Sequence, residues 1–153
     1  MIELDQRSPN NLIGEKSITP DTGKSALGLD GNLAAALGYP IGIIAIICLI
    51  MEKENRFVKF HALQSILLHV AFIVIAIALW IIGFILIIAG VAASAATSSS
   101  AIGSLLGMLI GLIWLVIIVL YLGGLIFAAV KSYGGSYFKL PVIGNMADKF
   151  ANK

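Results

Sequence analysis

Charge is scarce in this 153-residue sequence, and two long stretches have none. Charged residues make up 12% of the chain, yet no Asp, Glu, Lys or Arg occurs in residues 61–130 or in residues 31–51. A soluble domain needs charged residues over its whole surface, and its hydrophobic content is lower than the 59% found here. These absences exclude a compact water-soluble core and indicate an integral membrane protein.

Other absences exclude classes of function. The single cysteine, Cys48, rules out an intrachain disulfide, and a net charge of +2 is too small to predict nucleic-acid binding. The uncharged stretches contain no acid that could complete a nucleophile–base–carboxylate set, and the glycine-rich segment 23–31 lacks the spacing of a phosphate-binding loop. We therefore predict a protein that is not an enzyme, with no catalytic residues, no metal site, no cofactor and no nucleic-acid partner.

The apolar runs predict an all-α fold with three transmembrane helices. A membrane-spanning helix needs about 20 apolar residues, and runs of this kind cover about 32–51, 63–91 and 102–130. Residues 92–104 are small and rich in hydroxyl groups, which predicts a tight turn at the membrane surface. The chain is thus expected to comprise a transmembrane domain over 31–130, preceded by a polar tail of residues 1–30 and followed by a tail of residues 131–153.

Basic residues predict the orientation. Residues 1–30 hold five acids and no apolar run, so they are expected to be disordered rather than a signal or transit peptide, which favours the inner membrane of a prokaryote. With three spans, the loop after the first helix and the carboxyl tail share one side and hold seven bases, against three in the amino-terminal tail. The positive-inside rule then predicts a cytoplasmic carboxyl terminus and an external amino terminus.

The segment that joins the first two predicted helices combines bases with aromatic rings. Such a segment lies at the headgroup level, with its rings in the acyl boundary and its bases near phosphates. It can serve as a topological anchor or as a patch that binds anionic lipid or a protein partner. The candidate residues in this loop are Arg56, Phe57, Lys59 and Phe60, with Lys131, Lys139 and Pro141 of the carboxyl tail on the same side.

Polar side chains recur every four residues at the start of the second predicted span. His61, Ser65 and His69 lie on one helical face with Gln64 beside them. The two histidines are about 12 Å apart along the axis, too far to share one ion. Interhelical hydrogen bonds are the plainer interpretation, and a proton or solute path is the alternative.

Glycines at four-residue spacing predict close helix packing. Gly103, Gly107 and Gly111 form one such face, and Gly38 and Gly42 form another, with Pro40 between them as a kink. These faces serve either packing within one chain or assembly into a homo-oligomer. In the carboxyl tail, the apolar positions after Pro141 predict a short amphipathic helix on the cytoplasmic leaflet.

The segments NRFVKFHALQS and KSYGGSYFKLPVIGNMADKF, together with NLAAALGYP in the first span, resemble a known membrane family. The chain resembles the channel-associated component of the chloroplast inner-envelope protein-import translocon and its bacterial and archaeal relatives, most of them uncharacterised; the wide family also includes a magnetosome-membrane protein. The resemblance covers residues 32–150. It implies a multi-span protein that acts with partner proteins in protein transport.

Three functions follow as hypotheses. The first is a non-catalytic scaffold or channel-forming subunit related to import translocons, assembled with copies of itself or with other membrane subunits. The second is an accessory subunit or assembly factor of a larger membrane complex, and the third is a small transporter that uses the face of His69.

Overall fold

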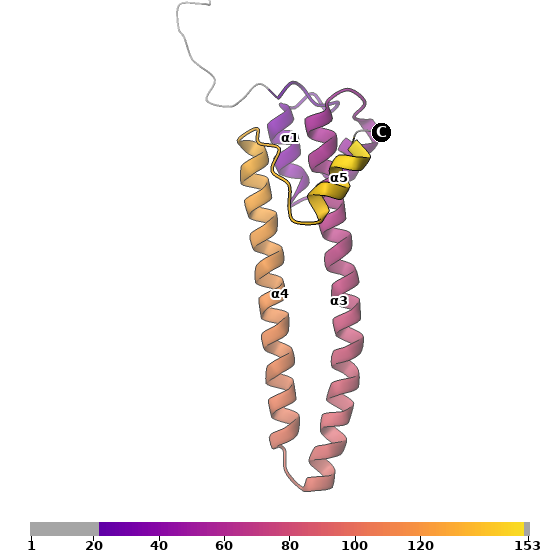
Figure 1. Cartoon of the computed structure of the whole chain (residues 1–153), viewed down its shortest axis with the longest axis vertical. Helices are drawn as coiled ribbons and strands as arrows, with labels where there is room; N and C mark the ends of the chain where they lie inside the picture. Colours follow the sequence, from indigo (N-terminus) through magenta and orange to yellow (C-terminus); the bar gives the residue numbers. More distant parts are fainter. Residues whose placement is uncertain (1–21, 152–153) are drawn as a thin grey trace, which may run out of the picture.

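The computed structural model describes residues 22–151, and these form five α-helices joined by short connections (Figure 1). They are α1 (Gly31–Gly38), α2 (Gly42–Met51), α3 (Arg56–Thr97), α4 (Ala101–Tyr133) and α5 (Ile143–Ala151). Two of them, α3 and α4, form a long antiparallel hairpin. The other three gather around the end of this hairpin at which α3 begins and α4 ends.

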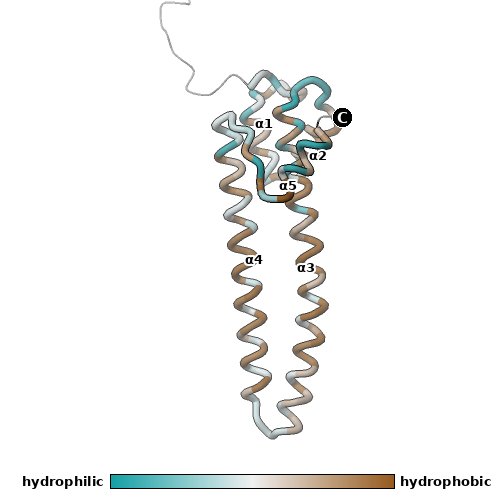
Figure 2. Tube along the Cα trace, viewed as in Figure 1, coloured by the Kyte–Doolittle hydropathy of each residue, from teal (hydrophilic) through white to brown (hydrophobic). Residues whose placement is uncertain are grey.

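The far part of the hairpin is an apolar stem, made of residues 70–97 of α3 and 101–124 of α4. Both α3 and α4 are long and apolar enough to cross a membrane, and almost nothing in their most apolar windows is buried inside the protein. The brown stem in Figure 2 shows this hydropathy without a polar break. At the tip, Ser98 adopts a left-handed conformation with φ of 53°, which ends α3 and reverses the chain. Helices long and apolar enough to be the expected second and third spans are thus present.

The first expected span, in contrast, is two short helices. Pro40 has no N–H to donate and cannot continue a helix, so α1 ends at Gly38 and α2 begins at Gly42. With 8 and 10 residues, the two helices are about 12 and 15 Å long, too short to cross a hydrocarbon layer of about 30 Å. They fold back on each other, since a Cβ added at Gly38 of α1 would lie 3.4 Å from the Cβ of Ala45 in α2. The prediction of three spans is therefore not confirmed.

The reversal between α1 and α2 brings the start of the described chain back to the end of the protein where α3 begins. Asn55 donates hydrogen bonds to the carbonyl oxygens of Thr22 and Lys24, and Asn32 donates one to that of Tyr133 at the end of α4. The expectation that the amino-terminal side lies opposite the carboxyl tail is wrong for these residues. Residues 22–30 are also ordered rather than a loose tail, while the prediction for residues 1–21 lies outside the described chain.

We call the assembly at this end the head: residues 22–30, α1, α2, α5, residues 56–69 of α3, residues 125–133 of α4 and the loops between them. Its interior is made of small side chains from α1 and α2 against Phe57 and Val58 of α3. Two smaller clusters join Tyr39 to Leu125 of α4 and Phe60 to Ala147 of α5. The head therefore holds the two stem helices together at one end. Along the stem they also contact each other directly, for example where Phe72 stacks on Tyr121 and where Gly90 lies next to Gly103.

Candidate functional site

A chain of buried polar side chains occupies the centre of the head. The two ring nitrogens of His61 lie 2.9 Å from the Tyr39 hydroxyl and 3.1 Å from the carbonyl oxygen of Ser136. Because a carbonyl only accepts, the Nε2–H of His61 donates to Ser136, and Nδ1 accepts from Tyr39. The Tyr39 oxygen accepts in turn from Gln64 at 2.7 Å. Every side chain in this series has a hydrogen-bond partner, so the series is a neutral and fully bonded structural unit.

Gln64 also holds the segment that follows α4. Its amide nitrogen donates to the carbonyl oxygen of Phe138 and its amide oxygen accepts from the N–H of Leu140, both at 3.1 Å. A Cβ added at Gly144 would lie 2.6 Å from the Cα of Lys139 and 2.8 Å from the Gln64 amide oxygen. The absence of a side chain at this position lets α5 approach the segment and pack on α3.

Ser65 and His69 complete the polar face in different ways. The Ser65 hydroxyl donates to the carbonyl oxygen of Gly38 at 2.7 Å, which satisfies one of the groups left free where α1 ends. His69 bonds through Nδ1 to the carbonyl oxygen of Ser65 in its own helix, and its ring packs edge-on against Tyr121 of α4. Interhelical bonding is therefore confirmed for Ser65 and extends from Gln64 to the tail, whereas His69 bonds within α3.

The loop between α2 and α3 closes the outer surface of the head. The buried carboxylate of Glu52 accepts from the N–H of Ala26 at 2.7 Å and from that of Asn55 at 3.0 Å. The side-chain oxygen of Asn55 accepts from the N–H of Val58 and so caps the first turn of α3. Glu52 and Asn55 thereby fix residues 22–26 over the top of the bundle.

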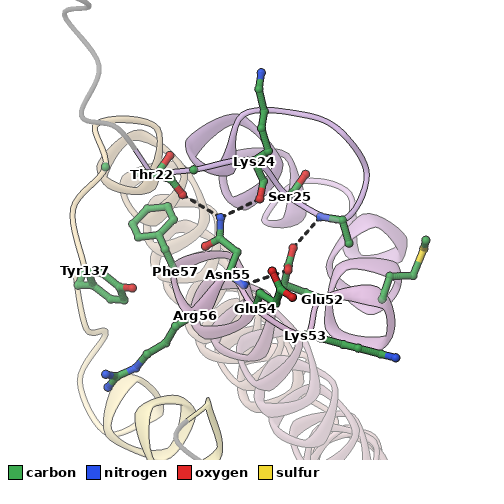
Figure 3. Close-up of a pocket in the computed structure, with 14 residues that line it drawn as sticks. Thr22, Lys24, Ser25, Glu52, Lys53, Glu54, Asn55, Arg56, Phe57 and Tyr137 are labelled. Atoms are coloured by element: carbon green, nitrogen blue, oxygen red, sulfur yellow. Dashed lines mark hydrogen bonds between the residues drawn. The ribbon is translucent and has the colours of Figure 1, made fainter.

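Next to this loop is an open depression of about 740 Å³, shown in Figure 3. Its walls come from residues 22–26, from the loop 51–57 and from Tyr137 of the tail. The polar groups at its floor belong to Glu52 and Asn55, which already bond to the backbone. Lys24, Lys53 and Arg56 extend outward from the rim, away from one another. The exposed acid Glu54 also lines the depression, which thus offers a charged rim rather than a set of converging reactive groups.

One acid in α5 neutralises part of this basic surface. Asp148 lies 2.9 Å from the ammonium of Lys139 and 3.4 Å from the guanidinium of Arg56. The hydrogen bond from Lys139, with help from both positive charges, lowers the pKa of Asp148 below its usual value. This triad links α5 to the start of α3 at the surface, outside the apolar interior.

The structure divides the predicted interface residues into two groups. Phe57, Phe60, His61, Gln64 and Ser65 are buried, so the expectation that the two phenylalanine rings enter the acyl boundary is wrong. Their rings instead pack edge-on against His61. The remaining candidates lie at the surface of the head, where a role in binding lipid or a partner stays a prediction: Arg56, Lys59, Lys131, Lys139 and Pro141.

The glycine faces are likewise divided. Gly38 packs against α2, and a Cβ at Gly42 would lie 3.7 Å from the ring of His69. Gly103 meets Ser94 and the backbone of Gly90 across the hairpin. A Cβ at Gly107 or at Gly111 would meet nothing within 4 Å, so these two glycines do not pack within the described chain.

The amphipathic helix of the tail is present as α5, but its apolar positions do not form one buried face. Gly144, Ala147 and Ala151 are buried, whereas Val142, Met146 and Phe150 are exposed. The small residues therefore pack on the head, and the bulky ones point away from it.

Sequence reasoning missed several residues of this region. Tyr39, Glu52 and Asn55 carried no signal beyond their polarity, and Gly144 was noted only within the family resemblance. Within residues 22–151, no group of three or more His, Cys, Asp or Glu side chains could hold a metal ion.

Together these features define a small helical membrane protein in which an apolar two-helix stem carries a head tied together by buried hydrogen bonds. The chain belongs to the magnetosome magnetite crystal formation protein family, whose sequence profile matches residues 26–147. It is 36% identical over 130 residues to a UPF0132 membrane protein of Methanocaldococcus jannaschii, covering 84% of this chain and 96% of that protein. A UPF0132 membrane protein of Archaeoglobus fulgidus is 37% identical over 123 residues, which are 77% of this chain and 92% of the relative. No solved structure matches the chain.

Proposed function

We propose that the protein is a non-catalytic structural subunit of a prokaryotic cytoplasmic membrane, with its head at the cytoplasmic face. The observation that carries this proposal is the internal use of the head's polar groups. No buried side-chain nitrogen or oxygen of the described residues lacks a hydrogen-bond partner. His61, Gln64 and Glu52 therefore support the proposal as elements that hold a shape, because none of them is left free to transfer a proton or bind a substrate.

Charge supports the orientation. All seven bases of residues 22–151 lie in the head, and residues 60–130, which include the whole stem, contain none. The positive-inside rule places such an end in the cytoplasm. With two spans rather than three, the residues that begin and end the described chain both face the cytoplasm, where the exposed bases meet anionic headgroups.

Gly107 and Gly111 favour a second candidate, in which several copies or other membrane subunits assemble around the stem. Glycines that face open space allow another helix to approach closely in lipid. A channel-forming role related to import translocons rests on such an assembly, because two stem helices enclose no path for a polypeptide. A single copy would act instead as an accessory subunit or assembly factor. A transporter role for His69 has less support, since one of its ring nitrogens bonds within its own helix.

Topology tests the orientation. In a Cys48→Ala background, single cysteines are introduced as Lys24→Cys, Ser98→Cys and Ser136→Cys. An impermeant thiol reagent added to intact cells should label only the Ser98→Cys protein, and lysis should expose the other two. Labelling of Lys24→Cys in intact cells would contradict the two-span orientation.

Native mass measurement tests the assembly. The protein is extracted in a mild detergent, and everything that comes with it is weighed. A stoichiometric complex with itself or with one partner supports a structural subunit. A monomer without any partner, found at several extraction conditions, would contradict it.

A further inference from the structure

The outer surface of the head is apolar where α2 faces away from the bundle. Ile43 and Ile50 are 69% and 74% exposed, and Ile46 and Ile47 lie between them on the same face. The opposite face of α2 packs on the head through Ala45 and Cys48. A helix with this exposed face is suited to lipid and unsuited to water.

The helix α5 presents a second face of the same kind. Met146 and Phe150 of α5 are exposed, and so is Val142 in the turn before the helix, while the small residues of α5 pack against Phe60, Leu63 and Leu67 of α3. Both outward faces thus flank the same stretch of α3.

The two faces continue the lipid-facing surface of the stem. Gly42 lies beside His69, so the apolar face of α2 begins where the exposed apolar residues of α3 begin at Val70. Figure 2 shows hydrophilic residues in the outer loops of the head and also along the tail and α5, whereas the stem is apolar. The charge of Asp148 in α5 is paired with Lys139 and Arg56. The apolar surface that α2 and the stem form together extends beside α3 from the level of about residue 60 to residue 91, about 48 Å at 1.5 Å per residue.

This length exceeds a hydrocarbon core of about 30 Å. Tilt and local changes in bilayer thickness accommodate such an excess at a modest cost per ångström, whereas leaving four isoleucines in water would forfeit the hydrophobic free energy of each side chain. The lower part of the head, with α2 and α5, is therefore placed in the leaflet next to it.

We infer that the protein is a membrane wedge that favours curved bilayers, with the leaflet that contains the head on the convex side. In that leaflet the cross-section of the protein contains α1, α2, α3 and α4 side by side with α5 against them, and in the opposite leaflet it contains only α3 and α4 (Figure 1). A helix about 10 Å wide occupies about 80 Å². The head leaflet thus holds at least twice the protein area of the other. The occupant of the apolar faces on α2 and α5 is lipid, and this inference goes beyond the proposed structural role.

Tubes pulled from giant vesicles test the wedge. Full-length protein carrying Cys48→Ala and Ser98→Cys, labelled at the stem tip, is reconstituted into vesicles of phosphatidylcholine and phosphatidylglycerol. Its density on an outward-pulled tube is compared with that on the parent vesicle. Quenching of tip labels by an impermeant agent separates the two orientations. Molecules whose head lies on the outer, convex side should be enriched on the tube several-fold, and more strongly on narrower tubes. Molecules with the reverse orientation should be depleted.

A matched pair of variants locates the cause. Ile43→Gln with Ile50→Gln makes the outer face of α2 polar, whereas Ile43→Leu with Ile50→Leu keeps it apolar. Both positions are exposed, so both variants should retain the thermal unfolding midpoint of the parent. If the glutamine variant unfolds at a lower temperature, the milder single change Ile43→Ser replaces it. Loss of enrichment with glutamine or serine, and its retention with leucine, would support the wedge. Equal tube and vesicle densities for the parent, or equal enrichment in both orientations, would overturn it. The native mass measurement, which tests the proposed structural subunit, does not depend on the outcome of the tube experiment.

Discussion

The tight packing around Gly144 predicts how much stability the protein loses when this position gains a side chain. In Gly144→Ala, the new Cβ would lie 2.6 Å from both the Cα and the Cβ of Lys139 and 2.8 Å from the amide oxygen of Gln64. Carbon atoms in contact are ordinarily about 3.5–4.0 Å apart, so the methyl group would overlap two atoms by about 1 Å. Lys139 cannot easily move, because Gln64 holds Leu140, the next residue, by its N–H.

The strain must therefore move α5 outward, away from the packing of Ala147 on Phe60. Overpacking of this kind costs about 1–3 kcal/mol. We expect a denaturant titration in detergent to show that the free energy of unfolding of the Gly144→Ala protein is lower by this amount. We also expect trypsin to cleave after Lys139 and Lys149 faster than in the parent. Tryptic cleavage reports on the packing of α5 directly, and the denaturant titration reports on its effect on the stability of the head.

Gly107→Ala is the matched control. It adds the same methyl group to a helical glycine with no neighbouring atom within 4 Å, and alanine is a better helix former by about 1 kcal/mol. We expect no loss of stability and unchanged proteolysis of the tail. If Gly144→Ala were as stable as Gly107→Ala and its tail as resistant to trypsin, the packing of α5 deduced here would be refuted.

Four further changes test other parts of the molecule. Gln64→Leu removes the bonds to Tyr39, Phe138 and Leu140 at similar volume and should cost about 2–4 kcal/mol in detergent unfolding, since it leaves buried backbone groups unpaired; equal stability would contradict their burial. Because the pKa of Asp148 is lowered in the folded protein, its contribution is present above the ordinary carboxyl range and is lost as pH falls through the lowered pKa. Tail proteolysis by an acid-active protease should therefore rise at low pH in the parent, while Asp148→Asn should show fast proteolysis at every pH. Gly107→Leu should leave thermal stability unchanged, and it should lower the native mass if the open glycine face joins copies. A lower melting temperature at constant mass would instead place a contact of Gly107 within the monomer. Replacement of four surface bases of the head by Gln, namely Arg56, Lys59, Lys131 and Lys139, should weaken salt-dependent binding to anionic vesicles by about 1 kcal/mol per base. Unchanged binding would leave these bases a topological role only.

The stem could be predicted from the sequence because hydropathy and length determine it. The expected spans 63–91 and 102–130 lie within α3 and α4. The turn expected over residues 92–104 is confined to residues 98–100, because both helices continue into the small residues on either side. In lipid a helix satisfies its own backbone, so an uncharged run of this length has few alternatives.

The head could be predicted only in part. The run from Asn32 to Met51 is as apolar as a span, and hydropathy is unaffected by a reversal of direction in the middle of it. Pro40 was interpreted as a kink, whereas the chain turns back completely there because α1 and α2 pack on α3 instead of continuing. That choice depends on contacts with residues 57–69, which no local pattern contains.

The polar cluster shows the same limit. Periodicity placed Gln64 and Ser65 on one face and indicated hydrogen bonds. Their partners are a backbone carbonyl at the end of α1, a tyrosine next to the break and the backbone of the tail. Backbone partners have no sequence signature, so only the fold could identify them.

The hydroxyl-rich tip of the stem has a consequence for biogenesis. The hydroxyls of Thr97 and Ser104 donate to carbonyl oxygens one turn earlier, and that of Ser94 accepts from the N–H of Gly103. Residues 92–104 contain no charge, so little desolvation opposes the passage of the tip through the bilayer. The two stem helices can therefore enter the membrane together as a preformed hairpin during synthesis, and in the proposed orientation the seven lysines and arginines of residues 22–151 stay on the side of the ribosome.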